Sequence, residues 1–354
     1  MTSSSVDLSS DVFEIRATPH AGRGVFASKL LSSGTIVYHT RPSTVNVTYR
    51  VFRREACSWC WEYNSGRTWK LSSLEAGVSI AYFCSNSCQT LWESLHQPPA
   101  RVALATIEQH LKKALKPSEE PVDSSTPTAS EVSEAWNVAG SLAEQIMLAR
   151  ASPSAKKSRK TLAKVLNQPL DADHMYFLLS AVIASWSQPE EFALLRQLER
   201  VDTAYRSQHH LQSHIGCFHV LLALLPAPIS SQVTSDVLRT VASADVHNSF
   251  GVWSGNGGIA TSAGEMLGYG IWADGSFFNH QCAPNIADRT REGRCWVFRT
   301  SRDVEQDEEL TISYLSREEL VELDVTARRQ ALAKSWGFQC GCSRCIEEIT
   351  AANR

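Results

Sequence analysis

The stretch Asn279-His280-Gln281-Cys282-Ala283-Pro284-Asn285 brings an amide, an imidazole, a thiol and a turn-forming pair together within seven residues. The Asn279 side chain can both donate and accept hydrogen bonds, which suits a ligand end that carries an amine and a carboxylate. Pro284 and Asn285 favour a tight turn directly afterwards. We interpret the ring of His280 as a packed core histidine.

Three further motifs are chemically complementary to this stretch. Gly22-Arg23-Gly24 follows a predicted strand and turn, and its two glycines let the backbone pass close to a ligand. Glu309-Leu310-Thr311-Ile312-Ser313-Tyr314 is typical of a buried strand that ends in a tyrosine, whose hydroxyl needs a partner. Cys340-x-Cys342-x-x-Cys345 offers three closely spaced thiols, one fewer than structural zinc requires.

Together and in this order, the four motifs resemble the SET-domain protein-lysine methyltransferases. A cysteine segment after the first motif resembles the SMYD-type branch, in which a MYND zinc finger interrupts the SET domain. The resemblance implies an α+β fold of short strands and small sheets with a pseudoknot, an inserted zinc finger, a helical insert and a cysteine-rich post-SET tail. It also implies S-adenosyl-L-methionine as cofactor and, as partner, a protein substrate that presents a lysine, either a histone tail or a non-histone protein.

The resemblance assigns roles to individual residues. Tyr314 would be catalytic, with its hydroxyl at the mouth of the methyl-transfer channel. Asn248 matches the first residue of the family's Asn-x-Phe segment, and Tyr269 matches a cofactor position but is equally typical of an ordinary strand aromatic. Gln281 stands where the family usually has serine. The implied cofactor-binding residues are Gly22, Arg23, Gly24, Asn248, Tyr269, Asn279 and His280.

Eight of the ten cysteines form two expected structural zinc sites. In the family, Cys282 supplies the fourth ligand to the tail cysteines, so the first set is Cys282, Cys340, Cys342 and Cys345. The spacing of the second set, Cys57, Cys60, Cys84 and Cys88, is that of a zinc finger. A full MYND finger interleaves two zinc sites, but the residues for a second are missing here. We therefore predict one zinc in this finger, with His96 not a ligand, which puts proline-rich peptide binding in doubt.

Composition narrows the class of protein. The chain has 354 residues, of which 43% are hydrophobic and 20% charged, and its net charge of −3 argues against nucleic-acid binding as the main role. The longest apolar run, 220–229, carries two prolines and is too short to span a bilayer, so no membrane association is expected. The N-terminal residues do not resemble a signal peptide. We expect residence in the nucleus, the cytoplasm or both, where cysteines bind metals before they form disulfides.

The pattern along the chain predicts five segments. These are the first part of the SET domain (11–50), the MYND-like finger (51–97), a helical insert (98–245) with a flexible loop at about 116–134, the second part of the SET domain (246–316) and the post-SET helix and tail (317–354). Helices are expected at 101–116, 135–150, 173–187, 190–225, 235–244 and 317–336. The basic stretch 156–160 is expected in a linker. The histidines His209, His210, His214 and His219 are interpreted as helix surface and core, because no acidic ligand stands near them.

A second hypothesis is a non-catalytic adaptor, in which a SET scaffold with a zinc finger recruits protein partners. The flexible loop, the incomplete finger and Gln281 favour it. The number of methyl groups transferred and the oligomeric state are not determined by the sequence.

Overall fold

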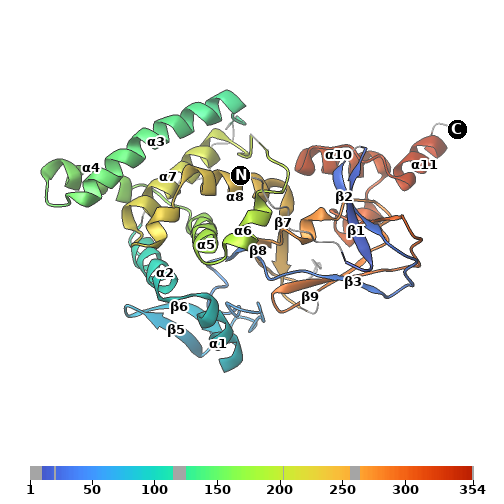
Figure 1. The fold of residues 1–354 in the computed structure, drawn as a ribbon, viewed down its shortest axis with the longest axis horizontal. Coiled ribbons are helices and arrows are strands. Elements are labelled where there is room, and N and C mark those ends of the chain that lie inside the picture. Colours follow the sequence, from blue (N-terminus) through green and yellow to red (C-terminus); the bar gives the residue numbers. More distant parts are fainter. Residues whose placement is uncertain (1–9, 20, 115–124, 202, 256–263, 353–354) are drawn as a thin grey trace. The chain divides into compact units, whose positions relative to one another are not determined.

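The computed structural model describes residues 10–19, 21–114, 125–201, 203–255 and 264–352. The chain forms two compact units, the first from Met1–Ser43, Val252–Met266 and Trp272–Arg354, the second from Thr44–Gly251 and Leu267–Ile271. Helices and small antiparallel sheets occur together (Figure 1), so the predicted α+β fold class is confirmed.

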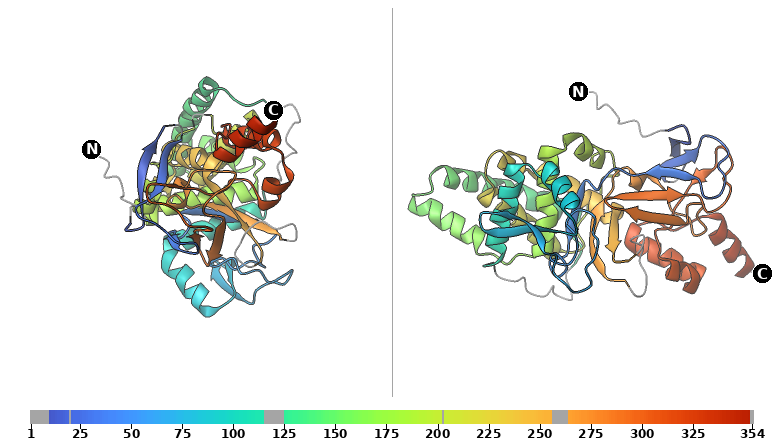
Figure 2. Two further views of the ribbon diagram at one scale, coloured as in Figure 1. Left: turned by 90° about the vertical axis from the view of Figure 1, so that its right-hand side faces the viewer. Right: turned by 90° about the horizontal axis from the view of Figure 1, so that it is seen from below.

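The first unit contains two three-stranded sheets. In one, β1 (Phe13–Thr18), β2 (Gly22–Ala27) and β11 (Glu309–Leu310) lie in that order, and the blue β1–β2 hairpin is visible in both views of Figure 2. In the other, β3 (Ile36–His39), β10 (Cys295–Arg299) and β9 (Asp288–Glu292) lie side by side. A short 3₁₀ turn, η3 (Gly275–Phe277), leads into the segment that begins at Asn279.

The C-terminal part of this unit is helical. The prediction of a single helix over 317–336 is wrong, because the chain forms two helices there, α9 (Arg317–Glu322) and α10 (Val325–Trp336). The break has a local cause: Asp324 has an extended backbone and its side chain accepts a hydrogen bond from the amide of Ala327, so it starts a new helix. Gly337 ends α10 in the left-handed conformation, and α11 (Ser343–Ala352) follows the cysteine tail.

The second unit begins with a small zinc-finger-like module. It consists of the hairpin β5 (Leu71–Glu75) and β6 (Val78–Phe83) followed by α1 (Asn86–Leu95), packed around Phe83 and Trp92. A further sheet has the order β4 (Val45–Thr48), β8 (Met266–Ile271) and β7 (Ser249–Trp253).

The remainder of the second unit is a helical bundle. Its elements are α2 (Pro98–Leu111), α3 (Ala129–Ala151), α4 (Lys156–Leu166), α5 (Ala172–Ser187), α6 (Pro189–Leu195), α7 (Gln208–Leu224), η1 (Ile229–Gln232) and α8 (Ser235–Asn248). Residues on all sides of α5 are buried, which makes it the central helix of the bundle.

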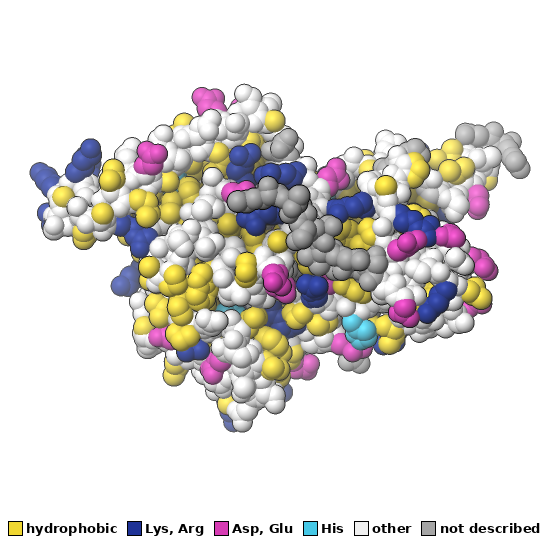
Figure 3. All heavy atoms as spheres, viewed as in Figure 1, with side chains coloured by type: hydrophobic (Ala, Val, Ile, Leu, Met, Phe, Trp, Pro, Cys, Tyr) yellow, Lys and Arg dark blue, Asp and Glu magenta, His cyan; other side chains and the backbone are white. Residues whose placement is uncertain are grey.

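In the second unit, α2 starts and ends three to five residues before the helix expected over 101–116, and α8 extends four residues beyond the expected 244. Larger differences from the sequence prediction occur at three places. Residues 129–134, expected in the flexible loop, belong to α3, because Thr128 and Glu131 form a capping box there; residues 116–124 of that loop lie outside the described part. The basic stretch 156–160 starts α4 and is not a linker, and Figure 3 shows Lys and Arg side chains in dark blue over this helix. The helix expected over 190–225 is two helices, α6 and α7. Within the described ranges, none of the helices has the length and apolar character needed to cross a bilayer.

Candidate functional site

Asn279 joins two of the motifs in the first unit. Its Nδ2 donates to the carbonyl of Arg23 at 3.0 Å and to Glu309 Oε1 at 2.7 Å. Gly24 allows this approach, since a Cβ there would collide with Glu309 Oε1 and lie 2.9 Å from both Asn279 Nδ2 and Thr18 Cγ2. Gly24 is thus required for the close packing of these segments. The sequence interpretation had instead assigned this glycine to contact with a ligand.

Gly22 and Arg23 occupy the exposed end of the same hairpin. Gly22 has a φ of +68° with open space where a Cβ would lie. The Arg23 guanidinium lies 4.8 Å from the ring centre of Phe277. The exposed main chain of this turn is therefore accessible to a ligand beside Asn279.

The stretch that begins at Asn279 and the stretch that begins at Glu309 pair with each other along their backbones. His280 forms a parallel bridge with Ile312, the Gln281 amide donates to the Ile312 carbonyl, and the Ile312 amide donates to the Asn279 carbonyl. Asn285 adds a second anchor, because its side chain accepts from the Thr311 amide at 2.8 Å and donates to the Glu309 carbonyl at 2.8 Å. Two segments about 30 residues apart in sequence are thereby held in a fixed register.

The side chain of His280 links the tyrosine to the cysteine tail. Its Nδ1 accepts from the Tyr314 amide at 2.9 Å, and its Nε2 lies 3.3 Å from Cys282 Sγ. The ring is buried, and desolvation lowers its pKa to about 4. The interpretation of this ring as a packed, hydrogen-bonded core histidine is therefore confirmed.

Tyr314 is surrounded by aromatic rings and bonded to the main chain. Its hydroxyl donates to the Phe278 carbonyl at 3.1 Å, and burial raises its pKa to about 12, so the phenol is neutral at physiological pH. The ring centre lies 5.6 Å from that of Trp336 and 6.2 Å from that of Phe338. The residues just before the cysteine tail thus form an apolar wall beside this hydroxyl.

The four cysteines predicted for the tail site come together. One sulfur from each of Cys282, Cys340, Cys342 and Cys345 lies within 4.8 Å of the others, and Cys282 Sγ is 3.5 Å from Cys345 Sγ and 3.9 Å from Cys340 Sγ. Four sulfurs at 2.3 Å from a tetrahedral zinc are about 3.8 Å apart, whereas a disulfide needs about 2.05 Å. The donor set therefore fits a structural zinc and not a disulfide.

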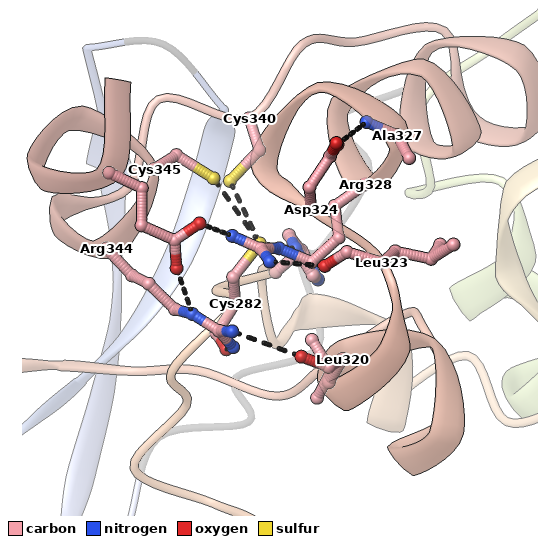
Figure 4. Close-up of polar contacts among 11 residues, drawn as sticks. Cys282, Leu320, Leu323, Asp324, Ala327, Arg328, Cys340, Arg344 and Cys345 are labelled. Atoms are coloured by element: carbon pink, nitrogen blue, oxygen red, sulfur yellow. Dashed lines mark hydrogen bonds and ion pairs between the residues drawn. The ribbon is translucent and has the colours of Figure 1, made fainter. Parts of the chain in front are cut away.

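Two arginines and a glutamate, which the sequence interpretation missed, support this cluster (Figure 4). Arg328, only 1% exposed, donates to the Leu323 carbonyl and to Glu348 Oε2 at 2.6 Å. Arg344 donates to Glu348 Oε1 at 2.8 Å and to the Cys282 carbonyl at 3.0 Å. Four thiolates around one zinc ion carry a net charge of about −2, so the adjacent guanidinium groups offset it. Arg344 stands inside the quoted tail motif, but nothing in the sequence links it to Glu348 or Arg328.

The second predicted tetrad also assembles, in the second unit. Cys57, Cys60, Cys84 and Cys88 are clustered, and the sulfur of Cys60 lies 3.6 Å from that of Cys84 and 3.8 Å from that of Cys88. Ser85 caps α1 by accepting from the Cys88 amide, which fixes that thiol at the start of the helix. His96 stacks on Trp92 with ring centres 4.1 Å apart, in line with its expected role outside the ligand set.

Asn248 and Tyr269 belong to the second unit, whereas Asn279, His280 and Tyr314 belong to the first. Asn248 ends α8, where its Nδ2 donates to the Ala244 carbonyl at 3.1 Å. Tyr269 lies on β8 with its ring centre 4.8 Å from that of Phe177 and 5.9 Å from that of Tyr49. Their contacts within this unit are those of a capping side chain and a packed strand aromatic.

Comparison with known proteins identifies the family. The SET domain family matches residues 22–315. The chain is 27% identical to the potential protein lysine methyltransferase SET6 of Saccharomyces cerevisiae, over 97% of both chains. It is 26% identical to the histone-lysine N-methyltransferase ASHR2 of Arabidopsis thaliana over 52% of this chain and 48% of that one. It is also 33% identical to a SET and MYND domain-containing protein of Dictyostelium discoideum, over 25% of this chain and 16% of that one. Since the family match spans well over half of the sequence, the chain belongs to the SET-domain family of protein-lysine methyltransferases.

Proposed function

We propose that this protein is an S-adenosylmethionine-dependent protein-lysine N-methyltransferase of the SMYD-like branch, with a SET domain interrupted by a MYND-like zinc finger. One observation carries the proposal: Asn279 holds the Gly22–Gly24 turn and Glu309 together, while the adjacent His280 holds Tyr314 beside the cysteine tail. That motifs scattered in sequence lie together in this way supports a site of the kind that the SET family uses.

The cofactor would bind at the turn beside Asn279. Both Nδ2 hydrogens of Asn279 are donated to Arg23 and Glu309, so its Oδ1 and the Glu309 carboxylate can accept hydrogen bonds from the ammonium of an amino-acid group. The exposed main chain of Gly22 and Arg23 and the main chain of His280 would complete the contacts. S-Adenosylmethionine, when bound, supplies a methyl group on a sulfonium leaving group.

Tyr314 would orient the substrate amine. Its hydroxyl is neutral and held by the Phe278 carbonyl, so it can direct a polar group without taking its proton. The apolar wall of Trp336 and Phe338 would lower the pKa of an entering lysine by desolvation, which favours the neutral amine needed for attack. Most of the rate would come from this alignment and not from a dedicated base.

The finger from Cys57 to Cys88 supports assignment to the SMYD-like branch, and the partial similarity to the Dictyostelium protein points the same way. We propose one structural zinc in this finger and one in the tail site. The lysine acceptor would be a histone or another protein, since one relative is named a potential protein lysine methyltransferase and another a histone-lysine N-methyltransferase. Residence in the nucleus or cytoplasm remains part of the proposal.

Calorimetric titration of the zinc-loaded full chain with S-adenosylmethionine and S-adenosylhomocysteine tests the cofactor site. We expect saturable one-to-one binding of both. Transfer of a labelled methyl group from the cofactor to histones and to proteome extracts then tests the activity. Binding without any transfer would favour the adaptor hypothesis, and the absence of binding by fully zinc-loaded protein would refute the proposed cofactor site.

A further inference from the structure

Three imidazoles from distant parts of the sequence meet in the helical bundle of the second unit. His174 lies near the start of α5, and His210 and His214 lie one turn apart on α7. One ring nitrogen from each lies within 4.8 Å of the other two. The ring centre of His174 is 5.3 Å from that of His210 and 5.1 Å from that of His214. The sequence shows the pair on α7 but not the third histidine, 40 residues from His214.

The spacing of these nitrogens fits a shared metal ion. His174 Nε2 lies 3.2 Å from His214 Nδ1. Two imidazole nitrogens bound at 2.0–2.1 Å to one tetrahedral zinc ion are about 3.3 Å apart. A hydrogen bond between two rings also spans 3.2 Å, but it does not account for the convergence of the third ring, that of His210, on the same point.

The surroundings of His214 are those of a metal ligand. Its ring is 1% exposed, and its Nε2 forms no regular hydrogen bond. The backbone carbonyl of Leu238 nevertheless faces the ring. A metal-binding histidine commonly directs its second ring nitrogen toward such a carbonyl, which fixes the tautomer.

The pocket also favours neutral imidazoles, the form that binds metals. The rings of Trp136 and Tyr205 border His214, with centres 5.8 Å and 5.4 Å from its own. Asp171 and Arg206, which carry opposite charges, both lie near His174.

We propose that His174, His210 and His214 form a third metal site, which binds one zinc ion or a similar transition-metal ion through three imidazoles. Such a donor set suits Zn²⁺, Ni²⁺ or Cu²⁺ and not Mg²⁺ or Ca²⁺. His174 and His210 are only partly buried, so the ion can enter from solvent and keep a water molecule in the remaining position, as zinc does with three protein ligands. The ion would cross-link α5 to α7.

Cobalt titration distinguishes this site from the cysteine sites. The full chain is first loaded with zinc until both thiolate sites are filled, and Co²⁺ is then added. We expect one further equivalent to bind, with visible d–d bands but without the intense sulfur-to-cobalt charge-transfer bands that thiolate ligands give. If no cobalt binds beyond the thiolate sites, the proposal is wrong.

The His210→Asn variant tests the ligand set at a partly buried position, and His209→Asn, at the neighbouring partly buried histidine, is the matched control. Loss of a second-shell partner costs 10–100-fold in metal affinity, so loss of a ligand should cost at least about 100-fold. We expect that loss for His210→Asn and wild-type binding for His209→Asn. Equal cobalt affinity in both variants, checked as folded by circular dichroism, would overturn the assignment.

Discussion

At the scale of single residues, the Tyr314 hydroxyl is the group on which the proposed chemistry depends most. We predict that Tyr314→Phe lowers kcat by about 10²–10³, the cost of removing one positioned polar group from an active site. Stability should fall by only about 1 kcal/mol, because the change removes one hydrogen bond, to the Phe278 carbonyl. Single-turnover transfer of labelled methyl, together with calorimetric cofactor binding, measures both effects. A variant with full activity would exclude Tyr314 from the reaction.

The two glycines of the first motif differ in their surroundings, and their variants should differ accordingly. Gly24→Ala places a Cβ against Glu309 and Asn279, so we expect it to displace Asn279 and lower cofactor affinity at least tenfold. Gly22→Ala meets open space and bears only the strain of a φ of +68°, about 1 kcal/mol. Thermal unfolding and calorimetric titration of both variants provide the comparison. Equal affinities would show that the Asn279–Glu309 contact is not needed for binding.

The sequence predicted which chemical groups are present at the candidate sites better than it predicted which of them contact each other. Seven of the eight predicted zinc-ligand cysteines could be chosen from their close spacing, whereas Cys282 was chosen from the resemblance to the family. The bond from Asn279 to Glu309 could not be predicted, since it depends on how two segments about 30 residues apart pair in the fold. The same limit hid His174, whose partners lie on another helix.

At the scale of elements, Glu348 on α11 connects α10 to the tail cysteines. It accepts from Arg328 and Arg344, and Arg344 also donates to the Cys282 carbonyl. We predict that Glu348→Gln speeds zinc release from this site by 10–100-fold, because partners of metal ligands tune affinity by that factor. Competition with a chromogenic chelator measures the rate. The exposed neighbour Glu347→Gln is the matched control and should release zinc at the wild-type rate; similar rates in both variants would contradict the role of Glu348.

Helix boundaries show what local sequence leaves open. The apolar run located α5 to within one residue, since nine of its sixteen residues are buried and none is exposed. It merged α9 with α10, because Asp324 can stand inside a helix or cap a new one, and the sequence alone does not show which of the two occurs. It also placed 156–160 outside any helix, although lysine and arginine are good helix formers and begin α4 there.

At the scale of the whole molecule, the two cysteine sites belong to different compact units, and their loss should have different consequences. Cys282→Ser removes a sulfur next to His280, which in turn holds the Tyr314 amide. We therefore expect it to abolish methyl transfer and to lower cofactor affinity. Cys60→Ser disrupts the finger in the second unit, and we expect it to leave cofactor affinity within about threefold of wild type.

Metal analysis and cofactor calorimetry on the two purified variants test this separation. Each variant should retain one zinc ion fewer than the wild type, because four ligands are needed to hold a structural zinc. Loss of cofactor binding only in Cys282→Ser would show that the tail site supports the active centre independently of the finger. Equal loss in both variants would mean that folding of the first unit depends on the finger in the second, since the described contacts of Cys60 lie within the second unit.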